Sequence, residues 1–175
     1  LASTFYDDPH MQIPRKTQVD AMVSFYAAFG SSPSALSTFD LFGARWAGFI
    51  KATKSGLYTF RTVIAGDDER VKLWIDNQMI IDHWTSLNTA SPKGTLYINA
   101  NLSSWYAVEL KYRQYAGTAR IELEWASSAI PRTIVQSDNL YQAYALQGFP
   151  VPMVNNPSKT CAANTEAFGT GLTLA

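Results

Sequence analysis

Two adjacent aspartates, Asp67 and Asp68, are the strongest candidates for chemistry in this sequence. They stand in the stretch AGDDERVKLWIDN, directly before an alternating segment typical of a buried strand. Two neighbouring carboxylates repel each other, because the charge of one disfavours ionisation of the other. The pair is therefore either a solvated turn in which both acids face water, or a site at which a positive group lies between them.

Catalytic groups are sparse elsewhere. The two histidines, His10 and His83, are isolated from any pattern of metal ligands or nucleophiles. A glycosidase needs two carboxylates that face each other about 5–10 Å apart across a cleft. Glu122 and Glu124 instead share one face of a predicted strand, which is typical of a solvated strand surface. We therefore expect a binding or structural domain and not an enzyme.

The composition limits the partners and the cross-links. The chain has 175 residues, is 47% hydrophobic and carries 14 basic and 14 acidic residues with no long run of either sign. A nucleic-acid partner requires a basic stripe, and a membrane span requires about 20 apolar residues; neither is present. We therefore expect no nucleic acid and no membrane insertion. The single cysteine, Cys161, allows neither a disulfide within the chain nor a cysteine-based zinc site.

The elements that position the acid pair are predicted to be strands, because apolar and polar residues alternate from about Leu41 onward. Residues 106–112 and 119–125 each show one apolar face, and we expect two antiparallel strands joined by a short loop around Gly117. Residues 70–82 predict a hairpin with its turn at 76–78. Further strands are expected at 44–50, 56–64, 95–99 and 133–141, whereas 17–29 fits either a helix or a strand. Many short strands separated by turns indicate an all-β sandwich or barrel.

The aromatic residues divide between core and surface. Trp46, Phe60 and Trp125 lie in alternating patterns that predict burial. Trp74 falls on the opposite strand face from Val71, Leu73 and Ile75. It therefore either faces outward or packs at the edge of a second sheet.

Four motifs in order carry a family resemblance: LFGARWAGFIKATKSGLYTF, GDDERVKLWIDNQMIIDHW, YAVELKYRQYAGTARIELEW and SDNLY. Together they resemble the PA14 domain over about residues 1–144. The resemblance implies a β-sandwich of two antiparallel sheets, used as a module in toxins, glycosidases, fungal adhesins and other surface proteins.

The resemblance also implies a calcium-dependent sugar site. In the lectin-like branch, two adjacent aspartates joined by a cis peptide bond hold a calcium ion that coordinates sugar hydroxyls, and Asp67 and Asp68 fall at that position. Calcium takes six to eight oxygen ligands, so the amide of Gln114 and the carbonyl of Ala116 are expected to contribute. The candidate sugar-binding residues are Asp67, Asp68, Gln114, Tyr115 and Trp84.

The sequence departs from the family pattern in two places. Glu69 and Arg70 follow the acid pair where relatives often have glycine; Glu69 could add a ligand, and Arg70 could satisfy an aspartate without a metal. The loop RQYAGTA is short and lacks the asparagine that sugar-binding relatives carry. Trp84 is either a structural residue or a platform that stacks on a sugar ring.

A domain boundary is expected near residue 145, where a linker rich in Pro and Asn begins. Residues 146–175 form this linker and then SKTCAANTEAFGTGLTLA, which is similar to the first strand of filamin-type immunoglobulin-like repeats. Residues 101–103 form a glycosylation sequon at Asn101. These features favour a non-catalytic, calcium-dependent carbohydrate-binding or adhesion module of a modular extracellular or cell-surface protein. The alternative is a PA14 spacer or protein-interaction domain without metal or sugar.

Overall fold

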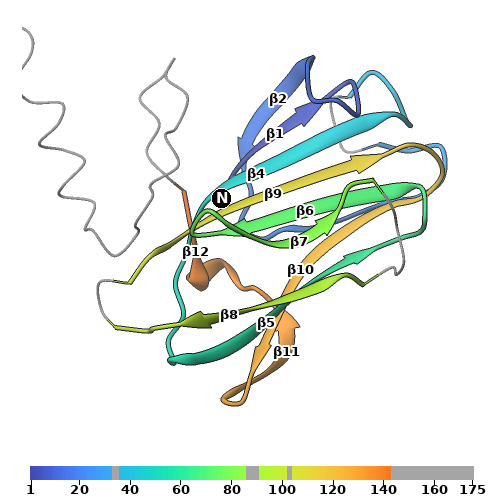
Figure 1. Cartoon of the computed structure of the whole chain (residues 1–175). Coiled ribbons are helices and arrows are strands. Elements are labelled where there is room, and N and C mark those ends of the chain that lie inside the picture. Colours follow the sequence, from blue (N-terminus) through green and yellow to red (C-terminus); the bar gives the residue numbers. More distant parts are fainter. Residues whose placement is uncertain (33–35, 86–90, 102–103, 143–175) are drawn as a thin grey trace, which may run out of the picture.

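The computed structural model describes residues 1–32, 36–85, 91–101 and 104–142, and these fold into two antiparallel sheets that face each other (Figure 1). The larger sheet, in spatial order, contains β2 (Pro14–Val19), β1 (Ala2–Tyr6), β4 (Phe42–Ile50), β9 (Tyr106–Gln114), β6 (Glu69–Ile75) and β7 (Gln78–His83), with β12 (Leu140–Tyr141) beside β4. The smaller sheet contains β11 (Ile130–Ile134), β10 (Ala119–Ser127), β5 (Gly56–Ile64) and β8 (Lys93–Ile98), with β3 (Ser24–Ala27) beside β10. The expected β-sandwich is therefore confirmed.

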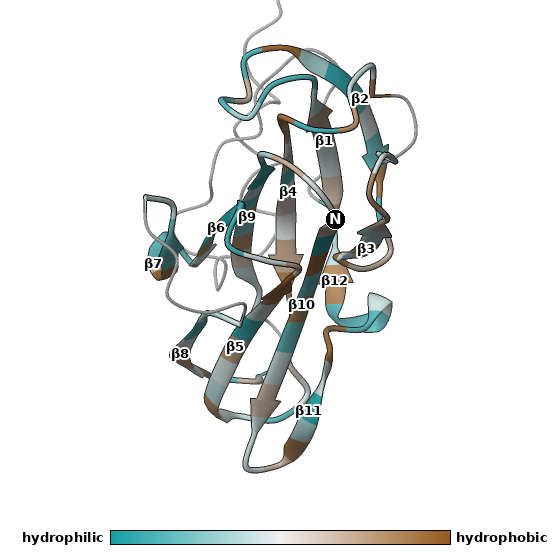
Figure 2. Cartoon of the chain, turned by 90° about the vertical axis from the view of Figure 1, so that its right-hand side faces the viewer, coloured by the Kyte–Doolittle hydropathy of each residue, from teal (hydrophilic) through white to brown (hydrophobic). Residues whose placement is uncertain are grey.

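The core lies between the two sheets and is built from the inward faces of the alternating strands. Trp46, Phe60 and Trp125 are buried as predicted, and the rings of Phe60 and Trp125 lie 6.3 Å apart. In Figure 2 the hydropathy colouring changes along β5 and β10, as apolar inward residues alternate with polar outward ones. Burial of each large apolar side chain contributes about 1.5–3 kcal/mol, so this alternation holds the sheets together.

The strands β9 and β10 do not pair with each other, so the predicted hairpin between them is wrong. β9 pairs with β4 and β6 in the larger sheet, whereas β10 pairs with β5 and β3 in the smaller one. Both strands have one apolar face, and these faces meet when residues 115–118 carry the chain across from one sheet to the other. Gly117 has φ +80°, which a residue without Cβ adopts at low cost.

The connection from β5 to β6 crosses between the sheets in the same way, through residues 65–68. Figure 1 places this loop and the loop from β9 to β10 at the same end of the sandwich. The acid pair and the predicted ligands Gln114 and Ala116 therefore lie on two neighbouring inter-sheet connections.

The remaining predictions have mixed outcomes. The hairpin of β6 and β7 is confirmed, and Asp76 and Asn77 at its turn have φ values of 51° and 63°. Residues 17–29 contribute strand residues and no helix; the one helical turn among the described residues is the 3₁₀ helix η1 (Ser137–Asn139). The boundary near 145, the filamin-type strand and Cys161 lie outside the described residues. None of the helical structure in the described ranges could span a membrane.

Candidate functional site

Backbone and carboxylate contacts join the two inter-sheet loops directly. The carbonyl oxygen of Asp68 accepts a hydrogen bond from the backbone N–H of Tyr115 at 3.1 Å. The Asp68 carboxylate accepts another from the N–H of Ala116, with 3.2 Å between Oδ2 and N. The structure therefore brings together Asp68, Tyr115 and Ala116, three of the predicted site residues, although they are almost 50 positions apart in the chain.

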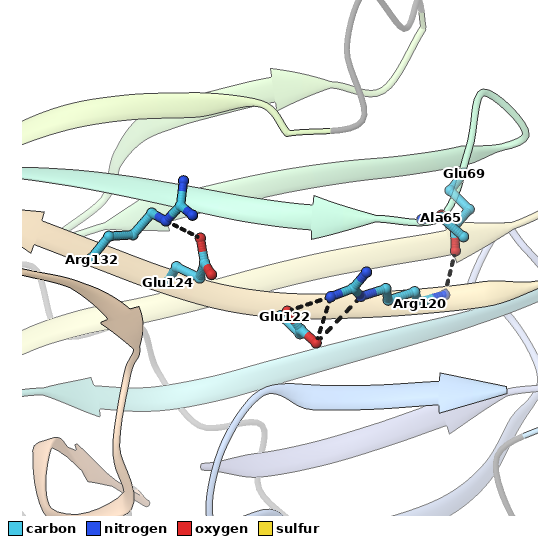
Figure 3. Close-up of polar contacts among 6 residues, drawn as sticks. All are labelled: Ala65, Glu69, Arg120, Glu122, Glu124 and Arg132. Atoms are coloured by element: carbon cyan, nitrogen blue, oxygen red, sulfur yellow. Dashed lines mark hydrogen bonds and ion pairs between the residues drawn. The ribbon is translucent and has the colours of Figure 1, made fainter.

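Glu69, the next acid in the chain, has a structural role in this arrangement. Its side chain is fully buried and accepts a hydrogen bond from the backbone N–H of Gly66 at 3.0 Å. It accepts another from the backbone N–H of Arg120 at 2.7 Å (Figure 3). The Ala65 N–H and the Tyr112 hydroxyl also donate to it. Burial raises the pKa of Glu69, although these hydrogen bonds act in the opposite direction. The Glu69 carboxylate oxygens therefore bind N–H and hydroxyl groups of the protein core and are not directed toward a ligand in solvent.

Arg70 stabilises the same loop through backbone carbonyls. Its Nη1 donates to the carbonyl oxygen of Asp67 at 2.6 Å and to that of Glu69 at 2.8 Å, and not to an aspartate side chain. The peptide bond between Asp67 and Asp68 is trans, so the cis bond that the resemblance implied is not present. The trans form is the favoured geometry for a bond that does not precede proline, and here the two carbonyls reach Arg70 and Tyr115.

Gln114 lies fully buried beneath the loops and has one unsatisfied atom. Its Nε2 donates to Asp40 Oδ1 at 2.9 Å and to the carbonyl oxygen of Gly117 at 3.3 Å. Its Oε1 is buried and has no hydrogen-bond partner within the part of the chain that the structure describes. A buried amide oxygen without a donor is costly, which makes this oxygen available for a cation.

Asp40 is a site residue that sequence reasoning missed. It precedes β4 and contacts Gln114 across 74 positions of sequence. Leu41, which follows it, has φ 59°, an uncommon conformation for a residue with a branched side chain. The only signal in the sequence was a single acid at the entrance to a strongly alternating strand, which is too general to indicate a site.

The oxygen atoms in this region that could act as metal ligands suit a hard cation better than a transition metal. They are the carboxylates of Asp67 and Asp68, the Gln114 amide oxygen and backbone carbonyls, which is the ligand chemistry of calcium. No three or more His, Cys, Asp or Glu side chains converge on a metal position within the described ranges. A calcium ion here would therefore depend on amide or carbonyl oxygens and water to complete its shell.

The two aromatic residues predicted to contact sugar both pack against arginines. The Arg113 guanidinium lies 4.1 Å from the centre of the Trp84 ring and 5.2 Å from that of Tyr115. Arg70 lies 5.9 Å from the same Tyr115 ring. Trp74 faces outward, as one of its two predicted orientations requires, between Lys72 and Lys111. Each contact is worth about 0.5–1 kcal/mol at an exposed position.

Arg113 contacts both rings, but not all of its N–H donors have hydrogen-bond partners among the described residues. Its Nη2 donates to the carbonyl oxygen of Trp84 at 2.6 Å, while its Nε is buried without a partner. Partial burial lowers the pKa of Arg113, Tyr115 acts to raise it, and the neighbouring charge of Arg70 lowers it further. Arg113 remains a cation at neutral pH, because the ordinary pKa of arginine lies far above neutrality.

A surface recess also lies between β1, β2 and β3, away from the two loops. Phe5, Asp20, Phe25 and Trp46 are among the residues that line it. Asp20 Oδ2 accepts a hydrogen bond from Trp46 Nε1 at 2.8 Å, so its main polar group is already paired. None of the predicted site residues lines this recess.

Comparisons with known proteins agree with this architecture. Residues 2–139 match the family model described as the PA14 domain. The chain is 26% identical to the anti-sigma-I factor RsgI3 of Acetivibrio thermocellus over 141 residues, which are 81% of this chain and 21% of that protein. A solved anti-sigma factor domain-containing protein from Clostridium clariflavum matches with a TM-score of 0.75 and 30% identity, over 86% of this chain and 49% of that one.

A third match is the epithelial adhesin 6 A domain of Candida glabrata, solved in complex with Galβ1-3GlcNAc. Its TM-score is 0.63 at 14% identity, over 84% of this chain and 88% of that one, and it shows a shared fold. The chain spans about a fifth of the length of the curated anti-sigma relative and about half of the solved one.

Proposed function

Since the chain belongs to the PA14 domain family, we propose that it is a non-catalytic module that binds carbohydrate with the help of a calcium ion. The observation that carries the proposal is the Oε1 of buried Gln114, which has no hydrogen-bond partner among the described residues and lies at the end of β9, directly before the loop whose N–H groups bind Asp68. An oxygen without a donor, next to a loop that carries two carboxylates, is a place where a cation lowers the free energy of the folded state.

Each residue has a distinct part in the proposed site. Asp67 and Asp68 supply negative charge, and Ala116 holds Asp68 in place through its N–H. Gln114 supplies a neutral oxygen, and Tyr115 lies where it can contact a ligand at the loop. When bound, calcium would supply coordination positions for a pair of sugar hydroxyls. Asp68 is thereby a positioning group for the sugar as well as a ligand.

The solved relatives and the chain's organisation support a binding module within a longer protein. One solved neighbour is named a sugar-binding domain from an RTX adhesin, and another is an adhesin domain in complex with a disaccharide. We infer an extracellular or cell-surface location, where such glycans are accessible. Neighbouring domains of the same chain would follow residue 145, with the filamin-type strand as the first part of the next one.

A spacer or protein-interaction domain is the second candidate. The observation that favours it is that Glu69 and Arg70 already hold the loop through protein contacts alone. The similarity to proteins named anti-sigma factors also fits a domain that works within a longer regulatory chain. Such a domain would use the same sandwich with no need for metal or sugar.

Glycan-array binding in millimolar calcium and in EDTA separates the two candidates. The array is probed with the wild-type chain, with Asp68→Asn and with Asp138→Asn, an exposed aspartate on η1 that serves as the matched control. The proposal expects calcium-dependent glycan binding that Asp68→Asn abolishes and Asp138→Asn retains. Glycan binding that persists in EDTA overturns the calcium mechanism, and the absence of any bound glycan favours the second candidate.

A further inference from the structure

The outer face of the larger sheet carries two pairs of like charges on adjacent strands. Arg70 of β6 lies directly opposite Arg113 of β9, and Lys72 lies directly opposite Lys111. Like charges directly opposite each other in a sheet are destabilising. Such an arrangement needs compensation from neighbouring acids, from aromatic rings or from a bound anion.

The lysine pair has acidic partners, whereas the arginine pair has none among the described residues. Lys72 Nζ lies 3.5 Å from Asp82, and Lys111 Nζ lies 3.5 Å from Glu109. Within the described part of the chain, neither Arg70 nor Arg113 has a carboxylate at ion-pair distance. The guanidinium group of each arginine instead donates hydrogen bonds to backbone carbonyl oxygens. Of the two pairs, the arginine pair is therefore the one without acidic compensation among the described residues.

Both guanidinium groups retain free donors. A guanidinium has five N–H donors. Within the described residues, Arg70 makes its two bonds through Nη1 alone, which leaves the Nε–Nη2 edge that fits the two oxygens of a carboxylate. Arg113 makes one hydrogen bond to the described residues, through Nη2, so its Nη1 has no partner among them, while its Nε is buried. Two cations with unused donors thus lie side by side.

Aromatic rings hold the pair in this position. Tyr115 lies within 6 Å of both guanidinium groups, and Trp84 packs on Arg113 at 4.1 Å. All four side chains are only partly buried, so the group is accessible from solvent. Aromatic side chains offer apolar faces that fit a sugar ring. This surface therefore combines a planar anion-binding group with surfaces suited to a saccharide.

We propose that Arg70 and Arg113 bind the carboxylate of an acidic sugar, which makes uronic-acid oligosaccharides the preferred ligand class of this module. The inference rests on the proposed carbohydrate binding and adds its specificity. A planar fork matches a carboxylate in two parallel hydrogen bonds, and this match distinguishes an acidic sugar from a neutral one. Sulfate and phosphate share the charge but not the sugar ring, so they serve as separate probes.

The test is calorimetric titration with tetrasaccharides of glucuronic, galacturonic and mannuronic acid, each beside its methyl ester, in calcium-containing buffer. The ester keeps the sugar ring and removes the charge. We expect at least one acid to bind about tenfold or more tightly than its ester, because a charged hydrogen bond is worth about a tenfold or larger factor. Inorganic sulfate and phosphate are titrated separately.

Arginine variants assign the effect to the pair. Arg70→Gln and Arg113→Gln should each reduce the preference for the acid over its own methyl ester about tenfold, because the ester reports any change that the variant causes in the rest of the site. Arg132→Gln on β11 of the other sheet removes the same charge and should have no effect; its own ion pair with Glu124 is at 3.6 Å (Figure 3). Circular dichroism and thermal melting verify that each variant is folded.

The outcomes separate the two proposals. Equal binding of acid and ester, unaffected by the arginine variants, overturns this inference while carbohydrate binding stands. Binding of inorganic sulfate or phosphate as tight as that of the acidic tetrasaccharides also overturns it, since the pair would then bind an anion without a sugar. If no glycan on the array and no tetrasaccharide binds the wild-type chain, both proposals fail.

Discussion

The carboxylate of Glu69 accepts a hydrogen bond from the backbone N–H of Arg120 at 2.7 Å, and this bond joins the two sheets of the sandwich. Glu69 begins β6 in the larger sheet, whereas Arg120 lies in β10 of the smaller one. The same carboxylate binds the Gly66 N–H and the Tyr112 hydroxyl. Glu69 thus fixes the acid-pair loop from the core side, which leaves Asp67 exposed and Asp68 part-exposed for a ligand.

Replacement of Glu69 by alanine should destabilise the domain by about 3 kcal/mol or more, because several donors lose their acceptor in a buried place. Urea denaturation gives the free energy of unfolding. Glu122→Ala is the matched control, since Glu122 makes only a surface pair with Arg120 at 3.0 Å and should cost less than about 1 kcal/mol (Figure 3). Equal losses in the two variants would contradict a structural role for Glu69.

The stability contributed by Glu69 should fall as pH rises. Burial raises the pKa of Glu69 in the folded state above its value in the unfolded chain. The folded state therefore binds the proton more tightly between these two values, and stability declines as pH rises through that interval. The free energy of unfolding of the wild type, relative to Glu69→Gln, should decrease as pH rises above about 4, the ordinary pKa of a glutamate side chain. An increase would mean that the four hydrogen bonds outweigh the burial of the charge.

Alternation in the sequence predicted which face of each strand is buried, but it did not predict the strand neighbours other than those of the β6–β7 hairpin, whose turn was visible. Trp46, Phe60 and Trp125 are buried as expected because their patterns depend only on period two. The same pattern cannot distinguish a hairpin of β9 and β10 from a crossing between sheets, since both bury the same residues. Only the partners of each strand, which are distant in sequence, decide between them.

The candidate site, like the fold, was predictable where it depends on a local motif and not where it depends on contacts between residues distant in sequence. The acid pair was visible as a local motif, and the contact of Asp68 with Ala116 agrees with the expected neighbourhood. Asp40 and the internal role of Glu69 were not visible, because each depends on contacts with distant residues. The pair of Arg70 and Arg113 was hidden for the same reason, since strand register and not sequence spacing sets them opposite each other.

Calcium should raise the melting temperature of the wild-type chain and not that of Asp68→Asn. A ligand present at about 100 times its dissociation constant stabilises the folded state by about 2.7 kcal/mol, which amounts to several degrees for a domain of this size. Asparagine keeps an acceptor for the Ala116 N–H, so the variant should fold without calcium. Differential scanning calorimetry in calcium and in EDTA measures the shift. A wild-type chain that melts identically in both would contradict a calcium site.

Replacement of Gly66 by alanine should weaken calcium binding by displacing Asp68. A Cβ at position 66 would lie 3.0 Å from Asp68 Oδ1, tighter than an ordinary contact, so the carboxylate must move. We expect the calcium dissociation constant to rise by at least about threefold, because a displaced ligand degrades the coordination geometry. Isothermal titration calorimetry measures it. Gly56→Ala is the control: its Cβ meets nothing within 4 Å, and although its φ of +155° makes the substitution strained, calcium affinity should be unchanged. If both variants bind calcium as the wild type does, the position of the Asp68 carboxylate does not control the calcium affinity.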